Sequence, residues 1–226
     1  RDPHGAFLGL ELEMEATSAY VSEGVDLIGN AFGDDWLYCK HDGSLNNGLE
    51  MVSHPITLEA WQDMESGLTD MLKALRRSGF RSWNTDSAGI HIHISFSAFT
   101  GERHIWLFQQ MFYRNQKAIE KFAGRSSHWG KLDAEKGYVG KVSKMKVAGR
   151  GYGTDRYMAV NLQNRDTLEI RVFRGSLNPE RVLANLELVH ALTEYTRSLP
   201  YCDVKDGALL VLVPRHPQRF DEVATL

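Results

Sequence analysis

The first regular pattern along the chain is a strict alternation of apolar and polar side chains. Between residues 7 and 15 the even positions hold three leucines and a methionine, whereas Glu11, Glu13 and Glu15 occupy odd positions. A period of two is typical of a strand that buries one face. Residues 89–97 repeat the pattern, with apolar side chains at the even positions and histidines at two odd ones. The sequence therefore predicts two half-buried strands.

Shorter strands are predicted elsewhere along the chain. In the last of them, leucine, isoleucine and valine face one way and Glu169 and Arg171 face the other. Glycine, proline and asparagine turn signals separate these segments. The shorter strands are residues 36–40, 48–52, 158–162 and 167–174.

Three long segments change to a helical period, in which apolar side chains recur every three or four residues. Thr57 is placed to cap the first helix, and the pair Asn178-Pro179 is a typical start for the third. The predicted helices are residues 57–78, 101–122 and 178–199.

Strand groups with helices inserted between them predict an α+β fold, a curved and mostly antiparallel sheet with helices packed on one face. The 226 residues contain no internal repeat or low-complexity linker, so we expect a single domain, residues 1–226. The 26 basic and 29 acidic side chains give a net charge of −3, which excludes a polybasic nucleic-acid coat.

Cysteine usage and hydropathy indicate a cytoplasmic protein. Cys39 and Cys202 are too few for a disulfide scaffold or a zinc ligand set, and two reduced thiols are the ordinary interpretation. The longest aliphatic run, residues 208–213, is far shorter than a membrane span. No secretory signal precedes the first strand, so a cytoplasmic location is expected.

The polar faces of three predicted strands carry an unusual set of side chains: three glutamates, a His-x-His pair and a Glu-x-Arg pair. A simple solvated sheet face is the alternative interpretation. Carboxylates two residues apart on one strand lie about 7 Å apart and repel by about 2.4 kcal/mol at an effective dielectric near 20. In a concave site divalent cations would offset this repulsion, and oxygen ligands with imidazole suit Mg²⁺ or Mn²⁺.

Five short motifs follow one another along the chain. They are Gly9-Leu10-Glu11-Leu12-Glu13, Asp42-Gly43-Ser44-Leu45, the segment from Gly48 to Pro55 (GLEMVSHP), the segment from Gly89 to Ser95 (GIHIHIS) and the segment from Thr167 to Asn178 (TLEIRVFRGSLN). They occur in the order seen in the amidoligase family, so the chain resembles this compact branch of the glutamine synthetase-like carboxylate–amine ligases. The resemblance runs from Gly9 to Asn178, which is 170 of 226 residues (178 − 9 + 1).

The resemblance implies a curved antiparallel sheet that binds ATP and two divalent metals on its concave face. By this analogy Glu11, Glu13 and Glu50 are metal ligands, and His91 and Glu169 hold the second metal. One further ligand of the first metal site stays open between Asp42, Glu15 and water.

The same resemblance implies roles for the remaining residues. His93 is expected near the ATP phosphates, and Arg171 is expected to bind the substrate carboxylate or the developing acyl phosphate, with Arg174 nearby. Asp42 is expected to contact the amine. The planar fork of an arginine matches carboxylate and phosphate oxygens.

Residues 124–153 form a basic, glycine-rich segment with seven glycines and seven Lys or Arg residues against two acids. We expect a mobile lid that closes over the nucleotide. A solvated loop and a nucleic-acid contact are the alternatives, and the few interleaved aromatics disfavour the latter. The candidate phosphate contacts are Lys131, Lys136, Lys141, Lys144, Lys146, Arg150 and Arg156.

The leading functional interpretation is an ATP- and Mg²⁺-dependent carboxylate–amine ligase that works through an acyl phosphate. One alternative is a metal-dependent hydrolase that uses the same Glu/His cluster, and another is a non-catalytic nucleotide-binding remnant of the fold. The expected partners are small-molecule or peptide carboxylates and amines, with no nucleic acid and no membrane. The sequence leaves the individual substrates and the oligomeric state open.

Overall fold

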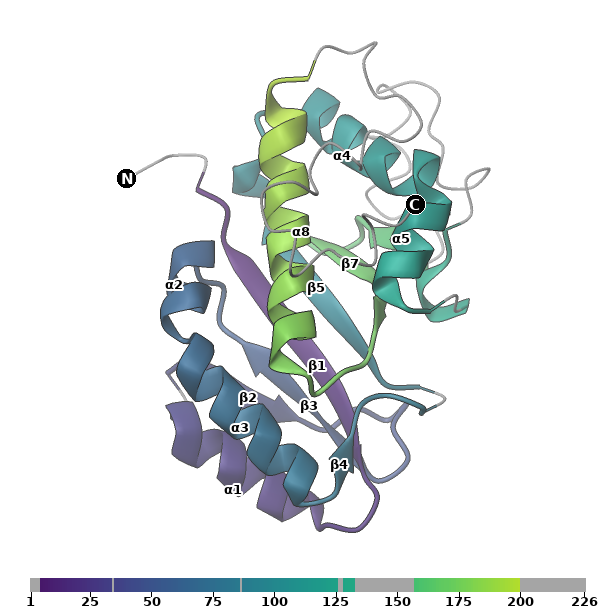
Figure 1. Cartoon of the computed structure of the whole chain (residues 1–226). Coiled ribbons are helices and arrows are strands. Elements are labelled where there is room, and N and C mark those ends of the chain that lie inside the picture. Colours follow the sequence, from purple (N-terminus) through teal and green to yellow (C-terminus); the bar gives the residue numbers. More distant parts are fainter. Residues whose placement is uncertain (1–4, 34, 86, 126–127, 133–156, 200–226) are drawn as a thin grey trace.

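The computed structural model describes residues 5–33, 35–85, 87–125, 128–132 and 157–199. These residues form a seven-stranded sheet in the order β2-β3-β1-β5-β7-β6, with β4 paired to β1 (Figure 1). Every pairing between the strands is antiparallel, as the sequence pattern predicts. The strands are β1 (Leu8–Ala16), β2 (Leu37–Lys40), β3 (Gly48–Ser53), β4 (Phe80–Arg81), β5 (Gly89–Ser95), β6 (Val160–Asn161) and β7 (Thr167–Arg174).

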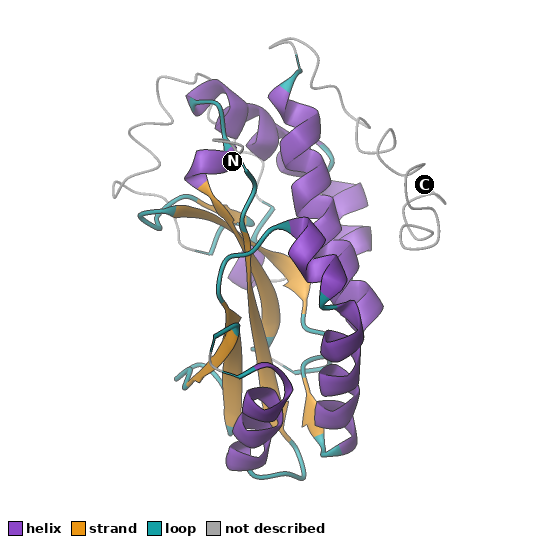
Figure 2. Cartoon of the chain, turned by 90° about the vertical axis from the view of Figure 1, so that its left-hand side faces the viewer, coloured by secondary structure: helices purple, strands orange, loops and turns teal. Residues whose placement is uncertain are grey.

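The apolar face of the sheet is buried under helices. The even-numbered side chains of β1 from Leu8 to Met14 are fully buried, as are the isoleucines of β5. The long helix α8 runs along this face, where it contacts β5 and the helices α2, α3 and α4 (Figures 1 and 2). The helices are α1 (Val21–Phe32), α2 (Leu58–Asp63), α3 (Glu65–Arg77), α4 (Glu102–Arg114), α5 (Gln116–Ala123) and α8 (Pro179–Arg197), with 3₁₀ turns η1 (Phe96–Ala98) and η2 (His128–Gly130).

Two of the predicted helices are each broken into two. The first divides into α2 and α3 at Met64, and the second divides into α4 and α5 at Asn115. The Asn115 side chain donates a hydrogen bond to Met111 O at 2.9 Å, and its backbone leaves the helical region with φ −110° and ψ 32°. An asparagine that bonds to nearby backbone competes with the helix in this way. The third predicted helix forms as α8, with Asn178 Oδ1 accepting from Glu180 N at 3.0 Å.

Helix α1 is absent from the sequence prediction. It contains two glycines, which are poor helix formers, and only Gly24 and Ile28 are buried. A Cβ atom on Gly24 would lie 2.6 Å from the Phe80 ring and 2.7 Å from Leu49 Cδ2. The glycine that weakens the helical pattern is therefore required, because it lets α1 pack closely against the sheet. The sequence analysis also did not predict the short strand β4. The strand expected at 158–162 forms over only two residues, as β6.

None of the helices in the described ranges is both long enough and apolar enough to cross a membrane.

A buried histidine joins α4 to α8 and gives a test of this packing. His104 Nδ1 accepts from Thr100 N at 3.2 Å, and Nε2 lies 2.8 Å from Thr193 O and 3.1 Å from Thr196 Oγ1. The ring is therefore neutral, with its proton on Nε2. Burial lowers the pKa of His104 below its ordinary value of about 6.5.

This pKa shift predicts a loss of stability in mild acid. A depressed histidine pKa contributes stability that is present above the unfolded-state value and is lost as the pH falls toward the folded-state value. We expect the free energy of unfolding to fall between pH 7 and pH 5 more steeply for the wild type than for His104→Gln. Urea titrations of both proteins across that range measure the difference, because all other titrating groups are shared. Parallel curves would contradict the neutral assignment.

Candidate active site on the polar sheet face

The opposite face of the sheet collects acidic and imidazole side chains from neighbouring strands. The strand register places Glu11 beside His91, and Glu13 beside Glu50. Paired residues in an antiparallel sheet project to the same side, with Cβ atoms about 4.5–5.5 Å apart. In the next row Gly9 of β1, His93 of β5, Glu169 of β7 and Asn161 of β6 follow one another across the sheet. Candidate ligands from different strands therefore share one surface.

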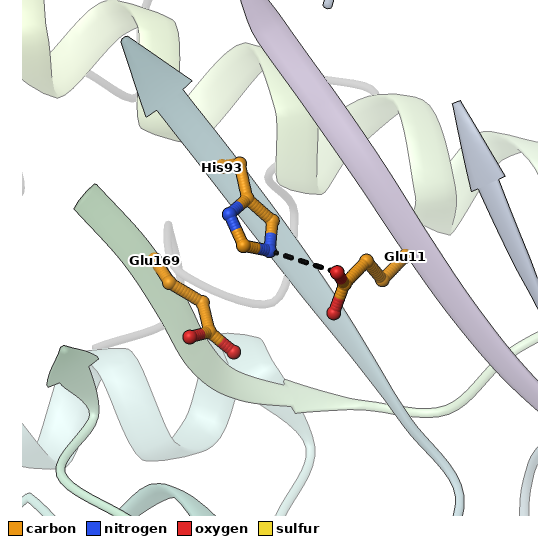
Figure 3. Close-up of side chains that lie close together, drawn as sticks. All are labelled: Glu11, His93 and Glu169. Carbon is orange, nitrogen blue, oxygen red and sulfur yellow. Dashed lines mark ion pairs between the residues drawn. The ribbon is translucent and has the colours of Figure 1, made fainter. Parts of the chain in front are cut away.

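Three of these side chains are arranged so that they could hold a metal ion. Each of Glu11, His93 and Glu169 offers one ligand atom, and the three atoms all lie within 4.8 Å of one another. Figure 3 shows the Glu11 carboxylate and the His93 ring turned toward each other, with Glu169 beside them. His93 Nε2 is 3.3 Å from Glu11 Oε1, and His93 Nδ1 is 3.0 Å from Thr167 Oγ1. Thr167 therefore orients the ring so that Nε2 faces the Glu11 carboxylate.

A second imidazole lies against the same two glutamates. The buried His91 places Nδ1 3.3 Å from Glu11 Oε2 and 3.6 Å from Glu169 Oε1. Burial acts to raise the pKa of Glu11, but close contacts with His91 and His93 outweigh it and hold that pKa well below the usual range. Glu11 is consequently ionised at neutral pH and available as an anionic ligand.

Glu169 is held by donors from its own strand, from the neighbouring strand β6 and from the turn between the two. Its carboxylate pairs with Arg171 Nη1, and it accepts from Asn161 Nδ2 at 2.9 Å and from Asn164 Nδ2 at 3.2 Å. Burial opposes ionisation here too, but Arg171 and His91 keep the pKa of Glu169 below its usual value. Arg171 Nε donates to Trp129 O at 3.2 Å, which fixes the guanidinium in place.

At the other end of the polar face, carboxyl groups lie close together with fewer positively charged side chains near them. Glu13 Oε2 accepts from Gly89 N at 2.6 Å, yet burial, with a contribution from Asp42, raises the Glu13 pKa. Burial and the charge of Glu11 raise the pKa of Glu50 to about 8. Burial of Asp42 is outweighed by hydrogen bonds from Ser44, which lower its pKa.

The residues present fit divalent cations. The donor set combines carboxylate oxygens with imidazole nitrogens, which suits Mg²⁺ or Mn²⁺. The buried His93 Nε2 atom has no hydrogen-bond partner of good geometry, although it faces Glu11. Glu11, Glu13 and Glu50 repel one another, as the raised pKa of Glu50 reflects. A cation would satisfy the imidazole nitrogen and offset this repulsion.

A β-bulge decides how β7 presents its arginines. The pairs Ile92–Ile170 and Ile90–Phe173 show that β7 contains one more residue than β5 between them. An extra residue reverses the alternation beyond it. Phe173 is therefore buried in the core, and Arg174 pairs with Gly89 on the polar face with an exposed side chain. Simple alternation would place these two side chains on the opposite faces.

The structure brings most of the predicted site residues to this face. Glu11, His91, His93, Glu169 and Arg171 form one contiguous cluster.

The remaining predicted residues lie around the cluster or beyond the described ranges. Glu13, Glu50 and Asp42 lie at its acidic end, whereas Glu15 lies further along β1 and accepts from Ser87 Oγ at 3.2 Å. The predicted contacts Lys144, Lys146, Arg150 and Arg156, and most of the predicted lid 124–153, lie outside the described residues.

Four polar residues of this face were not singled out from the sequence. Asn161 alternates with apolar neighbours, so its strand position was a usable signal. Lys40 ends a predicted strand, and its Nζ lies 4.0 Å from Glu11 Oε1. Asn164 occupies a turn, and Arg125 follows a helix, where no periodicity marks it.

One solved structure shares this fold. A search of curated proteins found no match. The solved structure titled "GmaS/ADP complex" is similar over 93% of this chain and 59% of its own, with 15% identity and a TM-score of 0.53. The complex between the prokaryotic ubiquitin-like protein Pup and its ligase PafA is similar over 98% of this chain and 58% of its own, with 9% identity and a TM-score of 0.43. The chain thus spans less than two thirds of the length of these proteins, and the likeness to the first shows a shared fold.

The family described as "Putative amidoligase enzyme" matches residues 32–144, which is half of the chain. That stretch contains Asp42, Glu50 and both histidines of β5, and the resemblance seen in the sequence motifs is confirmed. The chain belongs to this amidoligase family.

Proposed function

We propose that the protein is an ATP- and divalent-metal-dependent ligase that joins a carboxylate to an amine. The observation that carries the proposal is the convergence of Glu11, His93 and Glu169 from three strands on one polar sheet face, in a member of the amidoligase family. The motif order and the shared fold with GmaS, whose structure is titled as an ADP complex, support it.

Two groups of side chains are proposed to hold the metals. Glu11 and Glu169 would form one site with the two imidazoles of β5: His91, the ligand that the resemblance implies, and His93, whose Nε2 faces Glu11 and which would also lie next to the ATP phosphates. Glu13 and Glu50 would form the other, and Asp42 is the third ligand that its closeness to Glu13 favours. Bound cations would neutralise the phosphate charge and help to align the phosphoryl group.

Activation of the carboxylate is the step in which we place Arg171. An oxygen of the substrate carboxylate attacks the γ-phosphorus of ATP, the bond to the β-phosphate oxygen breaks, and an acyl phosphate and ADP form. Arg171 is held by Glu169 and Trp129, so its remaining donors stay in place without reorganisation. We infer that they bind the carboxylate and then the new phosphoryl oxygens, with Arg174 close by.

Amide formation follows in the second step. The neutral amine attacks the acyl carbon, inorganic phosphate leaves, and the nitrogen loses one proton. We propose that Asp42, whose pKa is lowered, stays ionised and binds the ammonium form of the amine. The ammonium releases one proton to water before it attacks, and the nitrogen releases a second proton to the departing phosphate or to water as the amide forms. The proposed phosphate contacts remain the basic residues Lys144, Lys146, Arg150 and Arg156. The segment 124–153 remains a proposed lid.

An ADP-release screen tests the proposal. Purified protein is incubated with ATP, Mg²⁺ and pooled carboxylates and amines, and mass spectrometry then identifies a product equal to the two substrates minus water. We expect ADP and phosphate to form together with the amide, and only when carboxylate, amine and metal are all present.

Omitting ATP and varying the acceptor separate the alternatives. Turnover that continues without ATP would favour a metal-dependent hydrolase on the same cluster. Nucleotide binding without ADP release for any pair would favour a non-catalytic remnant. Either result overturns the ligase assignment.

A further inference from the structure

One arginine outside the cluster joins two of the strands that carry it. Arg125 follows Gly124, the left-handed residue (φ 69°) that ends α5. Its Nη1 donates to Ala88 O at 3.3 Å, and its Nη2 donates to Arg171 O at 3.0 Å. The guanidinium therefore connects the start of β5 to the middle of β7.

The guanidinium fits only because position 89 has no side chain. A Cβ atom on Gly89 would lie 2.9 Å from Arg125 Nη1 and 3.0 Å from Nη2. Contacts below about 3.0 Å are too short for a methyl group, so even alanine would displace the side chain. Gly89 is thus matched to Arg125.

The carbonyl that Arg125 reaches on β7 lies at the bulge. The register between β5 and β7 shifts between the Ile92–Ile170 and Ile90–Phe173 pairs, and Arg171 falls within this interval. A bulge disrupts the ladder locally, and a backbone carbonyl there needs another donor. Arg171 N is bonded to Ala159 O at 2.9 Å, but Ala159 N donates to Lys131 O, so Arg125 supplies the donor for the Arg171 carbonyl.

The two carbonyls that Arg125 binds, Ala88 O and Arg171 O, are each close in sequence to a group of the candidate site. Gly89, next to Ala88, donates its N–H to Glu13 Oε2, and Arg171 pairs through its side chain with Glu169. A shift of either strand would therefore move a carboxylate of one proposed metal group or the guanidinium that we assign to the substrate.

We propose that Arg125 is a positioning residue that holds the start of β5 and the β7 bulge at a fixed separation, and so sets the distance from Glu13 to Arg171. The role for turnover rests on the proposed ligase function. The planar fork of arginine reaches two carbonyls at once, and the single ammonium group of lysine would not reproduce that geometry. Residues that orient a site's ligands in this way typically contribute 10- to 100-fold to activity or metal affinity.

Hydrogen exchange tests the strand contact without reference to catalysis. We expect backbone amides of residues 88–92 and 169–174 to exchange about tenfold faster in Arg125→Ala and Gly89→Ala, whereas residues 48–53 of β3 stay unchanged. Arg103→Ala is the matched control, because Arg103 Nη2 also donates to a backbone carbonyl, Leu199 O, but joins α4 to the residues that follow α8. Unchanged exchange in both test variants, or the same change in the control, would overturn the proposal.

Kinetics distinguish positioning from general stability. We expect Arg125→Lys to lower kcat for ADP release by roughly 10- to 100-fold while the KM for ATP stays within about twofold. Low-millimolar guanidinium chloride should restore part of the activity of Arg125→Ala but none to Gly89→Ala, in which the space is filled. A wild-type kcat in both variants, Arg125→Lys and Arg125→Ala, would contradict the positioning role. If the wild type releases no ADP, the proposed ligase function is wrong. Hydrogen exchange would still test whether Arg125 holds β5 and β7 together.

Discussion

Replacing Glu11 by glutamine is expected to abolish metal-dependent ADP formation, with a loss of roughly a thousandfold, or about 4 kcal/mol of transition-state stabilisation. Glu11 contacts both histidines of β5, His91 and His93, and lies in the same group of three ligand atoms as Glu169. Glutamine keeps the size and hydrogen-bonding capacity of the side chain, but it supplies no anionic oxygen for a cation.

The same substitution should leave the metal-free fold almost unchanged. Loss of the contacts with the two histidines destabilises the variant, whereas relief of repulsion with Glu50 stabilises it. The two effects oppose each other, so we expect the melting temperature to change by no more than about 3 °C.

Thermal denaturation with and without Mg²⁺ or Mn²⁺ measures both claims. A cation at a hundred times its Kd would stabilise the wild type by about 2.7 kcal/mol, and Glu11→Gln should lose most of that gain. Glu15→Gln is the matched control, since Glu15 belongs to the same strand face but bonds to Ser87 away from the cluster. Equal cation shifts in wild type and Glu11→Gln would refute the metal assignment.

Arg171→Lys is expected to show the second-largest effect, a fall in kcat of at least about 100-fold with little change in the KM for ATP. Lysine retains the positive charge next to Glu169. It lacks the second donor with which Arg171 binds Trp129 O, so its ammonium group is free to move. The expected defect is therefore one of orientation and not of charge.

Steady-state kinetics with saturating metal check this expectation. Arg165→Lys is the appropriate control, because Arg165 lies in the turn before β7 and its side chain is 94% exposed. We expect wild-type kcat and KM from it. A normal kcat in Arg171→Lys would show that a point charge suffices, and the bidentate role would have to be withdrawn.

The clearest agreement between sequence and structure concerns the two long central strands. Alternation in residues 7–15 and 89–97 identified both the buried face and the residues opposite it, because one side of an antiparallel sheet must be apolar whatever its neighbours are. The helices were harder to place. Met64 and Asn115 interrupt continuous helical patterns, and the Asn115 side chain does so through a local bond to Met111 O. Gly24 hides α1, because the side chains that require a glycine there, Phe80 and Leu49, lie elsewhere in the chain.

The candidate site, too, could be predicted only in part from the sequence. Glu11, His91, His93 and Glu169 were marked by their residue types and their place on polar strand faces. Their meeting within one cluster depends on strand order, which spacing along the chain does not encode. Arg125 carries no periodic signal at all, since its partners are carbonyls at Ala88 and Arg171.

The linear order of residues alone determined which side chains would be polar, which strands would carry them and which enzyme family they resemble. Only the tertiary structure decided that β1, β5 and β7 lie side by side, that a bulge turns Arg174 onto the polar face, and that Gly89 leaves room for a guanidinium. The reason is physical: alternation is a local property of one strand, whereas register, bulges and close approaches arise from the simultaneous packing of segments distant in sequence.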